Sequence, residues 1–312
     1  MSAYVKMSTR KRLLIVLLVL FVPPLLSGAI IVGVVAALDR TTGAIISSGE
    51  KREYLLHVPK SYDRTKATPL VISLHGAMGW PAFEMKITQW NLAADANGFI
   101  VVYPGGKGIG PKTWFMGGAR TPSRMPDVRF ISDLIDTLEA KYNIDPAMIY
   151  ANGLSNGGGM AFVLSCTLSN RIAAIGAVSA AQSLPFSWCP DSTAVPMIAF
   201  HGRKDPIVPY EGGKVWIAPE PFPNVPSWVA SWARRNHCAS DPVDSAVAAA
   251  VIRSAYTECA NDATVVLYTM EQGGHEWPGG MPLPEWLLGP TSHGINATNV
   301  TWTFFREHKL RR

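Results

Sequence analysis

One short stretch of the sequence carries residue types suited to nucleophilic catalysis. In "MIYANGLSNGGGMAFVLSC", Ser155 lies within the pattern G-x-S-x-G, between Gly153 and Gly157. The letters before the serine predict a strand and those after it a helix, so the serine would occupy a sharp turn at which glycines let neighbouring backbone approach. Such a turn exposes a hydroxyl for attack on an acyl carbon. The alternative is a serine that only caps the helix.

A serine hydroxyl becomes a useful nucleophile when a base takes its proton and a carboxylate orients that base. Asp205 follows a predicted strand in "VPMIAFHGRKDPIVPY", and His275 follows another in "ATVVLYTMEQGGHEWPGG". The order serine, acid, histidine, each after a strand, is the one expected for this turn. We therefore predict a Ser155, Asp205, His275 triad. The alternatives are a turn aspartate before a proline and a loop histidine that packs on Trp277.

Acyl transfer also needs N–H donors for the developing oxyanion. One donor is expected from Asn156, directly after the nucleophile, and the other from the turn in "LHGAMG", where we favour Ala77 over Met78. His75 in the same turn is expected to support the loop more than to transfer a proton.

Alternating strand and helix patterns must position these residues. Apolar runs predict strands at 68–76, 98–105, 147–153, 172–180, 195–202 and 263–270, and amphipathic spacing predicts helices at 130–143, 155–169, 225–238 and 298–310. This pattern predicts an α/β fold with a mainly parallel sheet flanked by helices. Asn296 and Asn299 each begin a glycosylation sequon, but we expect them to form the polar start of the last helix.

The N-terminus is apolar behind a basic leader. Residues 13–38 contain no charge, and four basic residues precede them: Lys6, Arg10, Lys11 and Arg12. As a helix this run would extend about 39 Å, enough to cross a bilayer core of about 30 Å. We expect residues 1–39 to be a leader with a hydrophobic helix, either an uncleaved anchor or a signal cleaved near Val35-Ala36-Ala37; a buried core helix is the third alternative. Residues 40–312 would form one catalytic domain outside the cytoplasm.

The chain has four cysteines, Cys166, Cys189, Cys238 and Cys259, without a CxxC pair. An even set of this kind favours disulfides over a metal site and agrees with an extracytoplasmic protein. Three pairings are open, and four buried free thiols are the alternative. The formal net charge is +5, but basic and aromatic residues do not interleave, so we expect no nucleic-acid partner.

Taken together, several motifs resemble one group of enzymes. They are "LHGAMG", "TWFMGG", "PDVRFISDLID", "GLSNGGGMA", "AFHGRKDPIVPY", "VASWARRNHC" and "GGHEWPG", within residues 51–308. The chain resembles the polyhydroxybutyrate depolymerase and feruloyl esterase group of α/β-hydrolases, including its actinobacterial envelope-associated members. The resemblance implies an α/β-hydrolase fold and a serine esterase that uses the predicted triad, without cofactor or metal.

The resemblance also implies structural detail. It pairs Cys166 with Cys189 and Cys238 with Cys259, and it suggests Trp114 and Trp277 as substrate-binding residues, although composition alone favours the core for either tryptophan. We add His75, from the predicted oxyanion turn, as a third candidate for substrate binding. Members of the group often carry a cysteine where Ala77 stands and a cysteine pair at positions 117–120, so a local disulfide beside the oxyanion loop is missing here. We expect no polymer-binding domain after the hydrolase domain, and therefore soluble short esters as substrates in preference to solid polyester.

These observations predict an extracytoplasmic carboxylic ester hydrolase for short-chain, hydroxyalkanoate-type, or feruloyl- and acetyl-type esters. Its expected partners are small or oligomeric esters, cell-wall polysaccharide, and a membrane through the N-terminal segment. One alternative is an envelope acyltransferase that uses the same triad and passes the acyl group to a sugar hydroxyl. The other is a catalytically silent, anchored binding module.

Overall fold

The computed structural model describes residues 37–108, 110–115, 125–182, 188, 189, 193–215, 218, 220–239 and 241–311. Nearly all of the predicted leader and hydrophobic helix lies outside these residues, as do positions 117–120. Within the described part, no helix is both long and apolar enough to cross a membrane.

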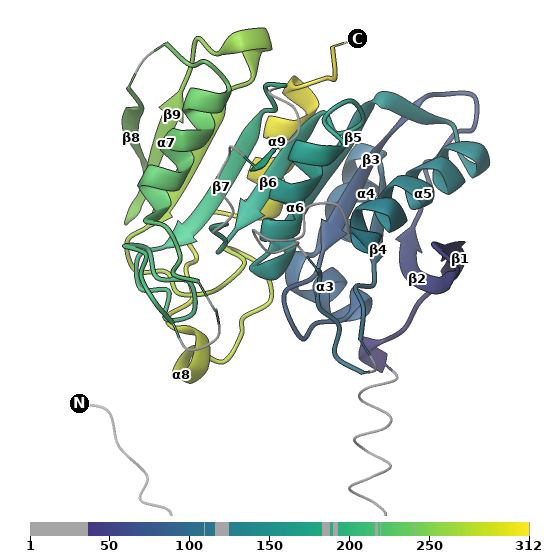
Figure 1. Cartoon of the computed structure of the whole chain (residues 1–312), viewed down its shortest axis with the longest axis horizontal. Helices are drawn as coiled ribbons and strands as arrows, with labels where there is room; N and C mark the ends of the chain where they lie inside the picture. Colours follow the sequence, from purple (N-terminus) through teal and green to yellow (C-terminus); the bar gives the residue numbers. More distant parts are fainter. Residues whose placement is uncertain are drawn as a thin grey trace, which may run out of the picture.

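A ten-stranded sheet forms the centre of the molecule, with the order β1-β2-β4-β3-β5-β6-β7-β10-β9-β8 (Figure 1). The strands are β1 (Gly43–Ser47), β2 (Glu50–His57), β3 (Thr68–Leu74), β4 (Ile100–Pro104), β5 (Ile144–Leu154), β6 (Ala174–Val178), β7 (Met197–Gly202), β8 (Val243–Ala248), β9 (Val251–Tyr256) and β10 (Val265–Met270). The six predicted strands are neighbours in the middle, and each adjacent pair from β4 to β10 is parallel. The predicted mainly parallel sheet is confirmed.

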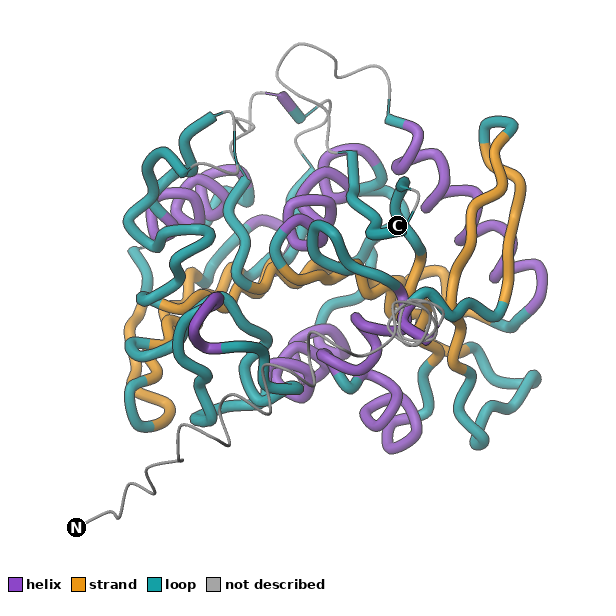
Figure 2. Tube along the Cα trace, turned by 90° about the horizontal axis from the view of Figure 1, so that it is seen from below, coloured by secondary structure: helices purple, strands orange, loops and turns teal. Residues whose placement is uncertain are grey.

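Helices cover both faces of this sheet (Figure 2). They are α3 (Pro81–Thr88), α4 (Trp90–Asn97), α5 (Pro126–Lys141), α6 (Asn156–Thr167), α7 (Val225–Arg235), α8 (Glu285–Leu288) and α9 (Ala297–Glu307). Side chains of α5, α6 and α7 share one apolar core, and those of α3, α4 and α9 share the other. Alternate residues of β3 supply both cores, since Leu70 and Ile72 join the first and Val71 the second.

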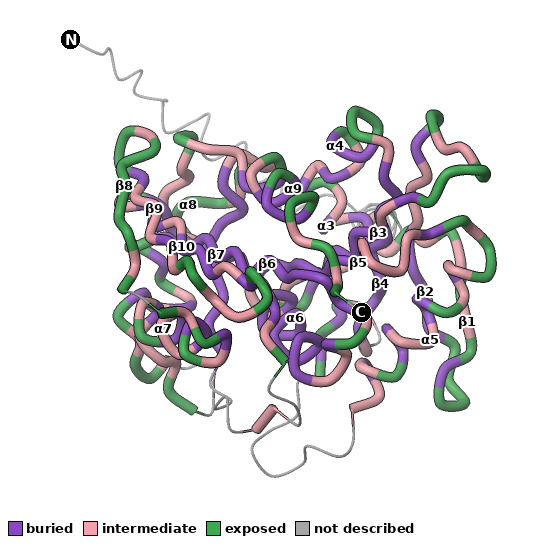
Figure 3. Tube along the Cα trace, turned by 90° about the horizontal axis from the view of Figure 1, so that it is seen from above, coloured by how far each residue is buried: buried purple, intermediate pink, exposed green. Residues whose placement is uncertain are grey.

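Burial falls from the middle of the sheet to its edge (Figure 3). Every residue of β4, β6 and β7 is buried, whereas five of the six residues of β8 are exposed. The central strands are therefore packed on both faces, and the edge formed by their carboxyl ends carries the candidate site.

Local features of the chain agree with the sequence expectations. Both implied disulfides are formed, with Cys166 bonded to Cys189 and Cys238 bonded to Cys259. The Asn296 side chain caps α9 by accepting a hydrogen bond from the backbone N–H of Asn299 at 2.9 Å. The sequon at Asn296 thus begins the last helix, as predicted.

Candidate active site

Three parallel strands carry the predicted triad residues to one edge of the sheet. Ser155 directly follows β5, Asp205 lies three residues after β7, and His275 lies five residues after β10. These strands are separated only by β6 in the order β5-β6-β7-β10. Because all four are parallel, their carboxyl ends meet at the same edge, where open α/β sheets bind ligands.

Ser155 occupies a strained turn between β5 and α6. Its backbone angles are φ 54° and ψ −118°, a region that residues other than glycine rarely adopt. Its N–H donates to the Val178 carbonyl at 2.8 Å, and α6 begins at the next residue. Such strain costs about 1–3 kcal/mol and persists where the surrounding structure enforces it.

Close backbone contact explains the glycines around Ser155. A Cβ atom on Gly157 would lie 2.0 Å from the Leu74 carbonyl oxygen, and one on Gly153 would lie 2.4 Å from the carbonyl carbon of Gly157. Neither position can hold a side chain while the end of β3 stays where it is. Because these glycines have no side chain, the Ser155 turn can pack directly against the end of β3.

His275 and Asp205 form a buried acid–base pair. The Nδ1 atom of His275 lies 2.8 Å from Oδ2 of Asp205, whose other oxygen accepts the N–H groups of Ile207 and Val208 at 2.8 Å each. Burial raises the pKa of Asp205, but hydrogen bonds from His201 and His275 outweigh it and the net pKa lies below the usual value. An ionised carboxylate only accepts hydrogen bonds, so Nδ1 carries the proton and Nε2 is left able to take another.

Two residues that sequence reasoning missed hold this pair. The ring Nε2 of His201, at the end of β7, lies 3.4 Å from Oδ2 of Asp205 and 2.8 Å from the Val208 carbonyl. Ser179, directly after β6, donates its hydroxyl to the Glu276 carbonyl at 3.0 Å and accepts the Glu276 N–H at 3.2 Å. The loop that bears His275 is thus fixed to the strand next to that of Ser155. A polar residue at a buried strand's carboxyl end was the signal for both.

The predicted oxyanion donors are Asn156, directly after Ser155, and Ala77, after β3. Strand β3 lies on the side of β5 away from β7 and β10, which carry the acid–base pair. Asn156 opens α6, where the first N–H groups of a helix lack partners within the helix. Ala77 is exposed in a turn closed by a 3.1 Å bond from the Gly79 N–H to the Gly76 carbonyl. A Cβ built on Gly76 would lie 3.6 Å from the Ser155 Cβ, so this turn adjoins the serine.

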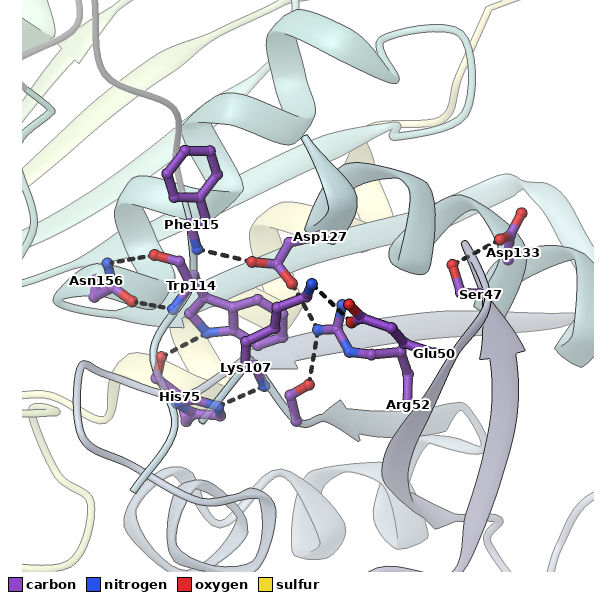
Figure 4. A network of polar contacts seen from close by, with 12 residues as sticks. Ser47, Glu50, Arg52, His75, Lys107, Trp114, Phe115, Asp127, Asp133 and Asn156 are labelled. Atoms are coloured by element: carbon purple, nitrogen blue, oxygen red, sulfur yellow. Dashed lines mark hydrogen bonds and ion pairs between the residues drawn. The ribbon is translucent and has the colours of Figure 1, made fainter. Parts of the chain in front are cut away.

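His75 supports that turn from the interior (Figure 4). Its Nδ1 donates to the Gly76 carbonyl at 2.7 Å, and its Nε2 accepts the Gly106 N–H at 3.0 Å. Burial, with smaller effects of the Lys112 and Arg52 charges, lowers its pKa to about 4. The imidazole is therefore neutral, with both nitrogens engaged, and its contact with substrate stays a prediction.

A buried polar network continues from Asn156 to β2 (Figure 4). The Asn156 side chain accepts the Trp114 N–H at 2.8 Å and donates to the Trp114 carbonyl at 3.4 Å. The next N–H, that of Phe115, donates to Asp127 at 2.7 Å, and Asp127 forms a 2.6 Å ion pair with Arg52. The sequence did not reveal this network, because its members come from four separate segments.

Both tryptophans suggested for the substrate pocket are buried. Trp114 is 2% exposed and donates its ring N–H to the His75 carbonyl, and Trp277 is 2% exposed and donates to the Thr298 hydroxyl. Phe115, next to Trp114, is 45% exposed. Substrate contact by the tryptophans stays a prediction.

Two buried glutamates flank the site. Burial raises the pKa of Glu276, next to His275, to about 8, although the Ser292 N–H opposes the shift. Burial likewise raises the pKa of Glu84, on α3, to about 8 against a hydrogen bond from the Ser73 hydroxyl. In the described part of the chain, histidine, cysteine and acidic side chains form no cluster of three that could hold a metal ion.

Comparison with known families agrees with this geometry. A family model described as Phospholipase/Carboxylesterase matches residues 62–217, half of the chain, including Ser155 and Asp205. The chain belongs to the phospholipase/carboxylesterase family. The predicted membership of an esterase-like α/β-hydrolase group is confirmed.

Curated relatives of the chain are carboxylic ester hydrolases. The bifunctional acetylxylan esterase/xylanase XynS20E of Neocallimastix patriciarum is 32% identical over 50% of this chain and 22% of its own length. Feruloyl esterase B of Piromyces equi is 29% identical over 72% of this chain and 42% of its own length. The chain therefore spans less than half the length of either relative.

A solved structure confirms the fold. The acetyl xylan esterase from Aspergillus awamori superposes with a TM-score of 0.59, covering 84% of this chain and 98% of that one at 14% sequence identity. At this identity the likeness speaks for the α/β-hydrolase architecture.

Proposed function

We propose that the chain is an extracytoplasmic serine carboxylic ester hydrolase with Ser155 as nucleophile, His275 as base and Asp205 as the orienting acid. The observation that carries the proposal is the 2.8 Å contact between His275 and Asp205, at strand ends beside the strained Ser155 turn. A buried histidine–carboxylate pair next to a half-buried serine in a strained turn has the geometry required for acyl transfer. Family membership supports the same reaction class.

In the proposed reaction the Ser155 hydroxyl attacks the ester carbonyl while His275 Nε2 takes its proton. The ionised Asp205 stabilises the resulting imidazolium, and the N–H groups of Asn156 and Ala77 bind the oxyanion. Collapse of the tetrahedral intermediate breaks the ester C–O bond, and the alcohol leaves with the proton from His275. Water then attacks the acyl-enzyme with His275 again as base, which releases the acid and restores Ser155.

The proposed substrates are acetyl- and feruloyl-type esters, free, oligomeric or attached to cell-wall polysaccharide. The names of the two relatives, an acetylxylan esterase and a feruloyl esterase, support these acyl groups. We call residues 75–79, which carry Ala77, the oxyanion turn. The exposed ring of Phe115, two residues from Thr113 in the loop beside this turn, offers an aromatic surface to an acyl group there. The two disulfides and the apolar run at residues 13–38 support an extracytoplasmic site of action.

A panel of esters on the purified full chain tests this proposal. The wild type is expected to release acid from para-nitrophenyl acetate and methyl ferulate, and the Ser155→Ala variant is expected to lose both activities. Ser231→Ala, an exposed hydroxyl on α7, is the matched control and should keep them. Equal activity of Ser155→Ala and wild type would overturn the proposal. Acid release that falls when a sugar acceptor is added, with acylated sugar formed, would identify an acyltransferase instead.

A further inference from the structure

Large apolar side chains are exposed on the edge of the sheet that carries Ser155. Met78 is 70% exposed, Phe115 45%, Trp286 86% and Leu287 51%. Met78 follows β3, Phe115 lies in the connection after β4, and the other two belong to α8, after β10. Met78 lies four residues after β3, at the carboxyl edge of the parallel strands, and backbone contacts place the segments that bear the other three beside this edge. We call these four side chains the apolar rim.

Backbone contacts fix the apolar rim around the candidate site. The Met78 N–H donates to the Thr113 hydroxyl at 3.3 Å, so Met78 lies beside the segment that bears Phe115. On the other side, the Leu288 carbonyl at the end of α8 accepts the His275 N–H at 2.6 Å. The rim therefore flanks both the oxyanion turn and the loop of the predicted base.

The N-terminal end of the described chain lies at the same edge. Asp39 forms a 2.5 Å ion pair with Lys112, and the Lys112 N–H bonds to the carbonyl of Gly79 in the oxyanion turn. Figure 1 shows the first described residues and α8 projecting from the same side of the sheet. The uncharged run of residues 13–38 therefore ends beside the apolar rim.

We propose that the apolar rim is a membrane-contact surface that inserts into the interfacial region of a phospholipid bilayer and turns the candidate site towards the lipid. Tryptophan is enriched at membrane–water interfaces because its ring is apolar and its N–H is polar. An apolar run long enough to span a bilayer ends at this edge. A bilayer that holds this run would therefore also face the apolar rim.

The charges beside the rim suit a lipid surface. Asp39 is paired with Lys112, and the Glu285 carboxylate next to Trp286 accepts the Thr291 N–H at 3.1 Å. Lys204, whose carbonyl lies against Gly289 at the end of α8, is exposed and adds a positive charge that anionic headgroups attract. The rim is an interaction surface beyond the proposed hydrolysis and does not depend on it.

Fluorescence quenching in vesicles tests the rim directly. The full chain is reconstituted into phosphatidylcholine–phosphatidylglycerol vesicles with and without brominated phosphatidylcholine, and the spectrum of Trp286→Phe is subtracted from that of the wild type. This difference isolates Trp286 among the ten tryptophans. We expect its emission to be blue-shifted and lost in brominated vesicles. Replacing both Met78 and Phe115 by serine should reduce that loss, whereas Leu92→Ser, an equally exposed apolar residue on α4, should not.

Two outcomes would overturn the membrane-contact surface. If the Trp286 emission is not blue-shifted and bromine does not quench it, the rim faces water. If the emission is blue-shifted but bromine does not quench it, a protein surface, such as a second copy of this chain, covers the rim. Because the readout is fluorescence, failure of ester hydrolysis would leave this test unaffected.

Discussion

The two halves of the candidate site are held by different forces. On the side of the oxyanion turn, the side chain of Asn156 and the buried pair of Arg52 and Asp127 hold the backbone of Trp114 and Phe115. On the acid–base side, backbone groups do most of the holding, as the N–H groups of His275, Ile207 and Val208 show. The first half therefore depends on buried charge for its shape, whereas in our proposal the second uses its charge for catalysis.

This contrast predicts which property each half loses on mutation. Removal of a charge from the oxyanion half leaves its partner buried and unpaired, which mainly lowers stability. Removal of a charge from the acid–base half leaves the backbone framework intact, which mainly lowers the catalytic rate.

The largest expected effect is on the rate of Asp205→Asn. The amide can still accept the N–H groups of Ile207 and Val208, but it presents a donor or a weaker acceptor to His275 and disfavours the productive tautomer. We expect kcat for para-nitrophenyl acetate to fall about 10⁴-fold, as in a triad that loses this carboxylate, with the urea unfolding midpoint nearly unchanged. Glu211→Gln, a neighbouring exposed acid, is the control. A large drop in stability with little loss of kcat would reverse the contrast.

Next in size is the stability of Asp127→Asn. Arg52 is 5% exposed and would remain buried without its carboxylate partner, which costs about 3–5 kcal/mol in the free energy of unfolding. The double variant Arg52→Met with Asp127→Leu removes both charges and should recover most of that loss in urea unfolding. A double variant no more stable than Asp127→Asn would show that the unpaired charge of Arg52 is not the main cause of the lost stability.

The smallest effects concern the pH dependence of stability through Glu84 and Glu276. Burial raises the pKa of each to about 8 from 4.5, so the unfolded chain ionises first and stability falls as pH rises from 4.5 to 8. Glu84→Gln and Glu276→Gln should remove this loss. Each variant should gain stability over the wild type across that interval, measured by urea unfolding at pH 4.5 and 8.5. A gain that does not depend on pH would contradict the raised pKa values.

The central strands and the Ser155 turn could be predicted because their local sequence determines them. Each central strand is a continuous apolar run, and Gly153 and Gly157 are required by backbone contacts that any tight turn of this kind makes. Asp205 and His275 could be chosen because each follows such a strand. Their 2.8 Å contact follows from the parallel order of β7 and β10.

The remaining features depend on contacts between distant segments. Strand β8, "VDSAVA", was missed because its residues are almost all exposed and its composition carries no apolar alternation. Arg52 and Asp127 lie 75 positions apart, so neither marks the other as a partner. Ser179 stands at the end of a predicted strand, but its contact with Glu276, on a loop 97 positions away, could not be predicted from the sequence.

The central claim is that Ser155 is a nucleophile activated by His275, and covalent labelling tests it most directly. The purified full chain is treated with a fluorophosphonate, and the modified peptide is located by mass spectrometry in the wild type, His275→Ala and the control His237→Ala. The account predicts a phosphonate adduct on Ser155 in the wild type and the control, and a strongly slowed reaction in His275→Ala. An adduct on another serine, or labelling of Ser155 at the same rate without His275, would contradict it.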